Sequence, residues 1–218
     1  MRWTIPNILT IARVLAAPGV GILFLVLDRP VADWAALVLF VMASLTDWVD
    51  GYIARRSNQG SAFGKMLDPI ADKAMVIIAA AVVMALNGLN PWIMVPLLAI
   101  LLREVLVSGL REYLGHVKLD VTRIAKWKTT AQMVSLALLL AAGPFSSVHD
   151  SWRFTLGPEI YARIAPGEIT DGIGLGRTIF LENATFALGL ITLWIAALLT
   201  VLSGADYMRK AMRYLEGK

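Results

Sequence analysis

Residues 47–72 read DWVDGYIARRSNQGSAFGKMLDPIAD, a stretch that sets four aspartates and two arginines within a chain of apolar runs. The acids are Asp47, Asp50, Asp68 and Asp72. Ionisable groups at membrane depth are costly, so they usually mark a functional site. Four carboxylates close together also repel one another unless cations hold them. Hard oxygen ligands favour Mg²⁺, Mn²⁺ or Ca²⁺ over zinc.

The composition around this stretch is that of an integral membrane protein. Of the 218 residues, 58% are hydrophobic and 17% are charged, and the mean hydropathy is +0.68. Six apolar runs approach the roughly 20 residues needed to cross the hydrocarbon core. They cover residues 6–27, 32–54, 66–86, 92–113, 125–143 and 183–203. The sequence therefore predicts an all-α fold, a single domain over residues 1–218 built as a bundle of six transmembrane helices.

The lysines and arginines indicate how this bundle is oriented. Most of them lie before the first span, in segments 55–65 and 118–128, and after residue 208, whereas the opposite ends of the spans carry few. The positive-inside rule then places both termini in the cytoplasm. Arg13 interrupts the first apolar run, so we expect that run to be a retained helix rather than a cleaved signal peptide. The chain has no cysteine, which excludes disulfides and thiolate metal sites.

Residues 144–182 form the one long connection between predicted spans. The segment contains three prolines, several glycines and mixed charge, a composition typical of loops. We expect an extramembrane loop on the outer side, with a short interfacial helix around Glu159 to Ile164 and no catalytic chemistry.

The second predicted span presents two acids on one stripe. At about 100° per residue, Asp47, Asp50, Gly51 and Ala54 share a helical face. The two small residues allow a ligand or another helix to come close. Arg55 follows at the cytoplasmic end, where its planar guanidinium can bind phosphate.

The third predicted span carries the other two acids. Asp68 and Asp72 are four residues apart and share a face, and Gly64 precedes them. Antiparallel packing of this helix on the previous one would bring all four carboxylates together near the cytoplasmic surface. Such a cluster suits two divalent ions that clamp a pyrophosphate. Asp72, at the edge of the cluster, is the candidate general base.

The spacing Asp-x2-Asp-Gly-x2-Ala-Arg-x8-Gly-x3-Asp-x3-Asp resembles the signature of the CDP-alcohol phosphatidyltransferase family, and all eight positions match. Members are six-helix membrane enzymes, often dimers, that transfer a phosphatidyl or similar group from a CDP-linked donor to an alcohol and release CMP. The resemblance implies that the four aspartates ligate two Mg²⁺ or Mn²⁺ ions and that Asp72 is the general base. It also implies that Gly51, Ala54, Arg55 and Gly64 bind the CDP moiety.

A second polar group points to the acceptor alcohol. Ser108 and Arg111 share a face of the fourth predicted helix, and Lys126, Lys128 and Thr129 lie at the start of the fifth. Cations, hydroxyls and a helix N-terminus together favour an anion, which predicts a site for the phosphate of a phosphorylated alcohol. The alternative is that these cations only fix the membrane topology. The neighbouring pair Arg103-Glu104 is interpreted as an internal ion pair or a scaffold.

Segments 5–13, 103–112 and 126–132 are similar to bacterial family members that use sn-glycerol 3-phosphate as acceptor, and the likeness covers about residues 5–143. It implies transfer from CDP-diacylglycerol to glycerol 3-phosphate, giving phosphatidylglycerol phosphate and CMP. The implied setting is the lipid of the bacterial inner (cytoplasmic) membrane, with a multi-pass homodimer whose active site faces the cytoplasm. Asn7 is assigned to the nucleotide, and no nucleic-acid partner is expected.

Other readings remain open. The same chemistry with inositol phosphate, serine or phosphatidylglycerol as acceptor is the nearest, although an uncharged acceptor would not need Arg111 and Lys128. A cation-coupled membrane transporter would place its acids at the bilayer midplane on broken helices, whereas these acids lie near helix ends. A purely structural membrane scaffold leaves the acid cluster unexplained.

Overall fold

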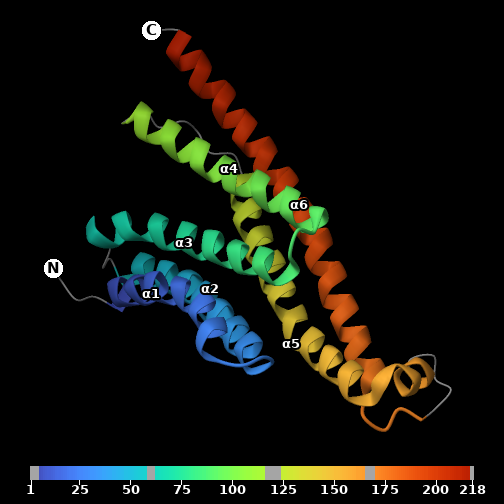
Figure 1. Ribbon diagram of the computed structural model, residues 1–218. Coiled ribbons are helices and arrows are strands. Elements are labelled where there is room, and N and C mark those ends of the chain that lie inside the picture. The colour runs from blue at the N-terminus through green and yellow to red at the C-terminus, as the bar shows by residue number, and fades with distance from the viewer. Residues whose placement is uncertain (1–4, 58–61, 116–123, 165–169, 217–218) are drawn as a thin grey trace.

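The computed structural model describes residues 5–57, 62–115, 124–164 and 170–216, with the backbone alone at residues 5–6, 47–57, 62, 65 and 124–126. These residues form six helices (Figure 1): α1 (Ile5–Val26), α2 (Val31–Ser57), α3 (Ala62–Asn87), α4 (Pro91–Leu114), α5 (Ile124–Ile164) and α6 (Leu175–Glu216). Five are long and apolar enough to cross a membrane, and the described apolar part of α2 ends at Thr46. The predicted all-α bundle is confirmed, and its membrane character is supported by these five spans.

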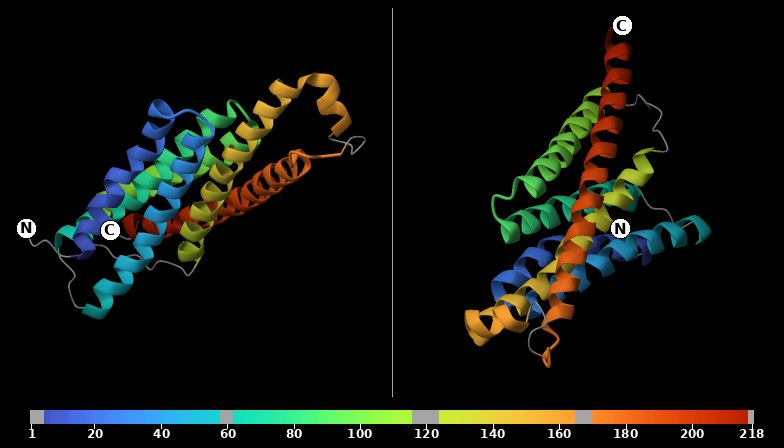
Figure 2. Two further views of the ribbon diagram at one scale, coloured as in Figure 1. Left: turned by 90° about the horizontal axis from the view of Figure 1, so that it is seen from below. Right: turned by 90° about the vertical axis from the view of Figure 1, so that its right-hand side faces the viewer.

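The helices form two groups joined by α5. Helix α1 packs against both α2 and α3, while α4 packs against α6. Helix α5 runs along α6 and also contacts α2 and α3, so it connects the groups (Figures 1 and 2). Because α2 and α3 carry the acids of residues 47–72, α1 and α5, which each contact both helices, position them relative to one another.

Apolar side chains from all six helices meet in one core. It includes Phe40, Met75, Val83, Leu97, Leu140 and Leu193. Large apolar side chains also cover the outside of the bundle, and Leu102 and Leu198 are each 61% exposed. An exposed apolar surface of this extent is typical of a lipid-facing protein, which agrees with the hydropathy.

The prediction of a loop over residues 144–182 is wrong for most of its length, because α5 continues to Ile164 and α6 begins at Leu175. The helix accommodates Pro144, and it bends only at Gly157, whose φ of 72° and ψ of 161° are not helical. His149 makes polar contacts both to α6 and to the part of α5 beyond the bend. His149 Nδ1 lies 2.6 Å from Glu182 Oε2, and His149 Nε2 lies 2.6 Å from the Tyr161 hydroxyl. The segment after the bend corresponds to the short helix expected around Glu159 to Ile164.

A buried acid ties the start of α2 to α5. Asp33 is 1% exposed, and it accepts hydrogen bonds from Arg29 at 2.9 Å and from the hydroxyl of Ser147 at 2.8 Å. A Cβ on Gly143 would lie 2.6 Å from Asp33 Oδ1, so only glycine lets α5 approach this closely. Asp33 is thus a buried acid with a structural role.

The start of α6 is capped by an exposed acid. Asp171 accepts hydrogen bonds from the backbone amides of Gly176 at 2.8 Å and Leu175 at 2.9 Å. These bonds favour the charged carboxylate and hold the pKa of Asp171 below its usual value. A negative charge also suits the positive end of the helix dipole.

We expect acid to weaken this cap. Since the folded-state pKa of Asp171 is depressed, its contribution to stability is fully present above the ordinary aspartate pKa and is lost as the pH falls through the lowered value. An NMR pH titration of the Leu175 and Gly176 amides should show a midpoint below that of an ordinary aspartate. Asp171→Asn should abolish that titration, and a midpoint at the ordinary value would contradict the assignment.

Candidate active site

The two acids of α3 lie against a buried cation of α1. Arg13 Nη1 donates to Asp72 Oδ1 at 3.0 Å, and Arg13 Nη2 lies 3.6 Å from Asp68 Oδ1. Thr10 donates its hydroxyl proton to the same Asp68 oxygen at 2.8 Å. The Arg13 side chain is 2% exposed, whereas those of Asp68 and Asp72 are 47% and 39% exposed. The two acids therefore contact a buried arginine while their own side chains remain partly exposed.

Helical periodicity places the polar face of α1 opposite these acids. Asn7, Thr10 and Arg13 follow one another at three-residue intervals, and all three are buried. Positions three apart lie on one side of a helix. Gly64, at the beginning of α3, is buried as well. Asn7 and Gly64, both predicted to bind CDP, thus lie within the packed part of the α1–α3 unit.

The acids and small residues of α2 lie at the end of that helix. Asp47, Asp50, Gly51, Ala54 and Arg55 all fall within Val31–Ser57, but their side chains lie outside the described residues. Whether their carboxylates join Asp68 and Asp72 stays a prediction.

The donor chemistry fits divalent metal ions. Asp68 and Asp72, one helical turn apart and partly accessible, present the hard oxygen ligands that Mg²⁺ and Mn²⁺ prefer. Among the residues whose side chains are described, no group of three or more His, Cys, Asp or Glu could hold a metal ion. The α3 acids would therefore need further ligands from α2, substrate or water, as is usual for Mg²⁺.

A second polar group lies where α3, α4 and α5 meet. Lys73 donates to the hydroxyl of Ser108, which in turn donates to the backbone carbonyl of Glu104. The carboxylate of Glu104 binds the ammonium group of Lys128 and lies 3.3 Å from Arg103 Nη1. These five residues, Lys73, Arg103, Glu104, Ser108 and Lys128, are called the acceptor-side cluster below. Two predicted acceptor residues, Ser108 and Lys128, meet in it.

The other predicted acceptor residues are placed differently. Arg111 is exposed, and its guanidinium carbon lies 5.9 Å from the ring centroid of Tyr207 in α6. Thr129 is half-buried in α5 next to Lys128. Lys126 lies in the first turn of α5, and its side chain lies outside the described residues.

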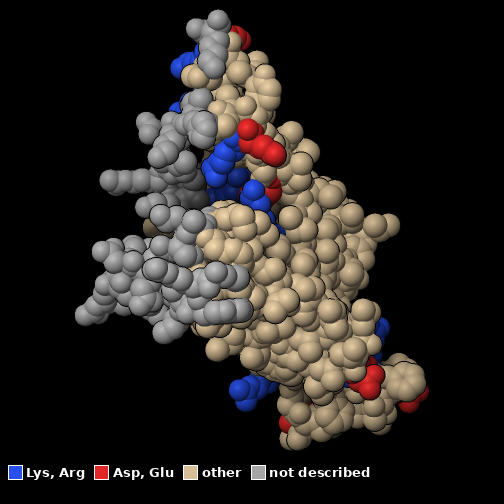
Figure 3. Space-filling model, turned by 90° about the vertical axis from the view of Figure 1, so that its left-hand side faces the viewer, with Lys and Arg blue, Asp and Glu red and all other residues tan. Residues whose placement is uncertain are grey.

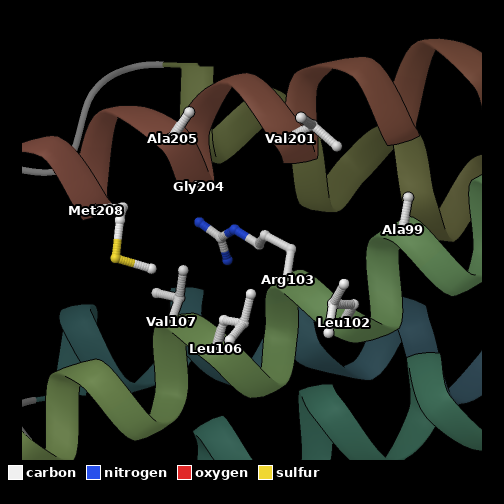
Figure 4. Close-up of a pocket in the computed structure, with 9 residues that line it drawn as sticks. All are labelled: Ala99, Leu102, Arg103, Leu106, Val107, Val201, Gly204, Ala205 and Met208. Carbon is white, nitrogen blue, oxygen red and sulfur yellow. The ribbon is translucent and has the colours of Figure 1, made fainter.

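Helix α6 meets this cluster at Arg103 of α4. Arg103 Nη2 donates to Ser203 Oγ of α6 at 3.3 Å, and Figure 4 shows the arginine side chain reaching from α4 toward Gly204. A Cβ on Gly204 would lie 2.7 Å from Arg103 Cγ, so the glycine makes room for the arginine. The expected internal ion pair Arg103–Glu104 is confirmed, and the hydrogen bond from Arg103 to Ser203 joins α4 to α6.

Charged side chains gather on one face of the molecule. Figure 3 shows basic side chains in a hollow of that face, with acidic side chains beside them. A hollow that holds charges of both signs suits a substrate with a polar headgroup.

Sequence reasoning assigned no site role to Thr10 and Arg13, which orient the α3 acids. It expected Glu104 only as the partner of Arg103, whereas Glu104 also binds Lys128. Arg13 carried a usable signal, since it is a lone cation in an apolar run on the same face as Asn7 and Thr10. From the sequence, Lys73 is interpreted as a charge-balancing or snorkelling residue. In the structure it contacts the hydroxyl of Ser108.

The bundle and its site define a membrane-embedded helical protein with partly exposed acids next to a cationic cluster, the arrangement expected of an enzyme that acts on phosphorylated lipid precursors. The CDP-alcohol phosphatidyltransferase family model matches residues 3–166. The chain belongs to this family, and the prediction made from the motif is confirmed.

Similar proteins share most of the chain length. A protein of Cereibacter sphaeroides is 51% identical over 219 residues, covering 99% of both chains. One from Rickettsia bellii is 38% identical over 212 residues, covering 96% of each. One from Escherichia coli K12 is 40% identical over 144 residues, covering 64% of this chain and 78% of its own. All three are named CDP-diacylglycerol–glycerol-3-phosphate 3-phosphatidyltransferase.

Proposed function

We propose that the chain is a phosphatidylglycerophosphate synthase. It transfers the phosphatidyl group from CDP-diacylglycerol to sn-glycerol 3-phosphate and releases CMP. The observation that carries the proposal is the α3 acid pair, held by Arg13 yet open to solvent, in a chain that matches all eight motif positions. The acceptor expected from the sequence flanks is also the one named in the relatives above.

The motif residues divide between the donor and the metal ions. Asp47, Asp50, Asp68 and Asp72 would hold two Mg²⁺ or Mn²⁺ ions, which neutralise charge on the pyrophosphate when bound. Around them, Asn7, Gly51, Ala54, Arg55 and Gly64 bind the CDP moiety. Glycine and alanine leave the backbone accessible to the nucleotide, and the arginine supplies a planar donor for phosphate.

Catalysis then depends on positioning and on one proton transfer. Asp72 accepts the proton of the primary hydroxyl of glycerol 3-phosphate. The hydroxyl oxygen forms a bond to the phosphorus that bears diacylglycerol, and the bond from that phosphorus to the CMP oxygen breaks, so CMP leaves with the bonding electrons. Arg13, buried behind Asp72, fixes the direction of the carboxylate through the 3.0 Å hydrogen bond. Holding both reactants in register supplies much of the rate.

The phosphate of the acceptor binds to residues of α4 and α5. We assign this role to Ser108, Arg111, Lys126, Lys128 and Thr129. The contact of Lys73 with Ser108 and that of Lys128 with Glu104 support this region as a preorganised polar site.

The membrane setting completes the proposal. The chain forms one domain with six membrane spans and cytoplasmic termini, since lysines and arginines concentrate at one set of helix ends. CDP-diacylglycerol enters from the cytoplasmic leaflet with its tails in lipid, and glycerol 3-phosphate arrives from the cytosol. We place the protein as a homodimer in the bacterial inner membrane.

A turnover assay tests the function. Purified protein in detergent is incubated with CDP-diacylglycerol, Mg²⁺ and radiolabelled glycerol 3-phosphate. We expect label in the lipid phase with equimolar CMP, and EDTA should abolish both. CMP release only with inositol phosphate, serine or phosphatidylglycerol would keep the family chemistry and change the acceptor. Folded protein that releases no CMP with any acceptor would overturn the proposal.

A further inference from the structure

We propose that Lys73 is a specificity-determining residue for the acceptor, binding the phosphate of a small phosphorylated alcohol while its neighbour Asp72 takes the proton from that molecule's hydroxyl. The inference rests on the proposed function and adds a residue that the family motif does not assign.

The net charge of the acceptor-side cluster favours binding of an anion. Lys73, Arg103 and Lys128 supply three positive charges and Glu104 one negative charge, so the five residues have a net charge of +2. Arg103, Glu104 and Lys128 have side chains that are at most 14% exposed, and charge of one sign in such a place is unfavourable without a counter-ion. A phosphomonoester carries close to two negative charges near neutral pH, so it matches this excess.

Lys73 differs from the other two cations in its partner. Lys128 and Arg103 both contact the carboxylate of Glu104. In the part of the chain that the structure describes, the contact made by the Lys73 ammonium group is to a neutral hydroxyl, that of Ser108. Its charge is therefore the one best able to pair with an incoming phosphate.

Ser108 holds the Lys73 side chain in place. Its hydroxyl proton points to the backbone carbonyl of Glu104, and its oxygen accepts from Lys73. This arrangement fixes the direction of the flexible lysine side chain before any substrate arrives. Preorganisation of this kind reduces the entropy lost on binding.

Helix α3 links this cation to the proposed base. Asp72 and Lys73 are consecutive, so they point about 100° apart around the helix. Asp72 contacts Arg13 of α1, and Lys73 contacts Ser108 of α4. A molecule that reaches both must carry its phosphate and its attacking hydroxyl only a few bonds apart. Glycerol 3-phosphate meets that requirement, serine has no phosphate, and phosphatidylglycerol has only a phosphodiester.

Steady-state kinetics of the purified protein test the inference. Lys73→Met should raise the KM for glycerol 3-phosphate about tenfold or more, the effect of losing a hydrogen bond to a charged group. The KM for CDP-diacylglycerol should change less than about twofold by the same reasoning. Lys73→Arg, which keeps the charge, should restore part of the affinity, and a merely structural role would not predict that rescue.

Two further variants keep the test decisive. Lys210→Met removes a lysine that pairs with Asp206 on α6 at 2.8 Å and belongs to neither the motif nor the acceptor-side cluster, and it should leave both KM values unchanged. If Lys73→Met does not fold, Ser108→Ala should still raise the KM for glycerol 3-phosphate selectively. An unchanged KM in folded Lys73→Met would overturn the inference while the proposed function stands. A wild-type protein inactive with glycerol 3-phosphate would instead overturn the proposed function.

Discussion

Replacing Asp72 with asparagine is expected to abolish turnover while the protein still folds. Asparagine has nearly the same shape and keeps an oxygen that can accept the hydrogen bond from Arg13, now 3.0 Å from the carboxylate. It cannot accept a proton from the acceptor hydroxyl at neutral pH. Loss of a general base typically costs about 10²–10⁴-fold in rate, and loss of a metal ligand would add to this. The measurement is kcat for CMP release.

Asp206→Asn is the matched control for this variant. The Asp206 side chain is 38% exposed, close to the 39% of Asp72, and it pairs with Lys210 on the same helix. The same chemical change there should leave kcat within about twofold, as expected for a partly exposed residue that belongs to neither the motif nor the acceptor-side cluster. If folded Asp72→Asn keeps substantial activity, Asp72 is not the base.

The helical period correctly predicted that the two acids of α3 lie on one face. Asp68 and Asp72 share a face because they are four residues apart, and the structure shows both beside one arginine. Sequence reasoning placed Ser108 and Lys128 in one polar region, and the acceptor-side cluster contains both. Local spacing and the type of side chain were sufficient for these residues.

What sequence reasoning missed depends on contacts between distant parts of the chain. The dipeptides Gly143-Pro144 and Gly157-Pro158 are typical helix breakers, yet α5 continues past the first and bends only at the second. Its extension is held by the contact between His149 and Glu182, which are 33 residues apart. No local pattern indicates such a pairing.

One acid within an apolar helix of this chain has a structural role instead. Asp33 is nearly fully buried, but its partners Arg29 and Ser147 use it to join α2 to α5. Asp68 and Asp72 differ from it by remaining partly exposed. Access to solvent, which the sequence does not encode locally, separates the structural acid from the proposed functional ones.

Replacing Arg13 with methionine is expected to reduce both activity and stability. The guanidinium is 2% exposed and contacts both α3 acids, so its loss leaves two carboxylates that repel each other. Removing one partner of a buried ion pair costs about 3–5 kcal/mol. Since the acids here are partly exposed, solvent screening reduces this to roughly 1–3 kcal/mol. Residues that orient metal ligands typically affect activity about 10–100-fold, and we expect kcat to fall by that factor.

The dependence of stability on Mg²⁺ distinguishes this role from general packing. In the wild-type protein Arg13 already neutralises part of the charge on Asp68 and Asp72, so a divalent cation has less repulsion to relieve. In Arg13→Met the same cation should therefore raise the Tm in detergent by a larger amount. Arg29→Met is the matched control, because Arg29 also pairs with an acid, at 2.9 Å, but at the other end of the bundle.

Arg29→Met should lower the Tm while leaving the increase produced by Mg²⁺ at its wild-type size, because Asp33 lies away from the proposed metal ions and is 1% exposed. Arg13→Lys should recover part of the lost kcat, since a lysine keeps the charge but lacks the planar fork that spans two carboxylates. An equal Mg²⁺ increment in Arg13→Met and wild type would show that Arg13 does not act on the metal-binding acids. Its burial beneath Asp72 would then serve only the packing of α1 against α3.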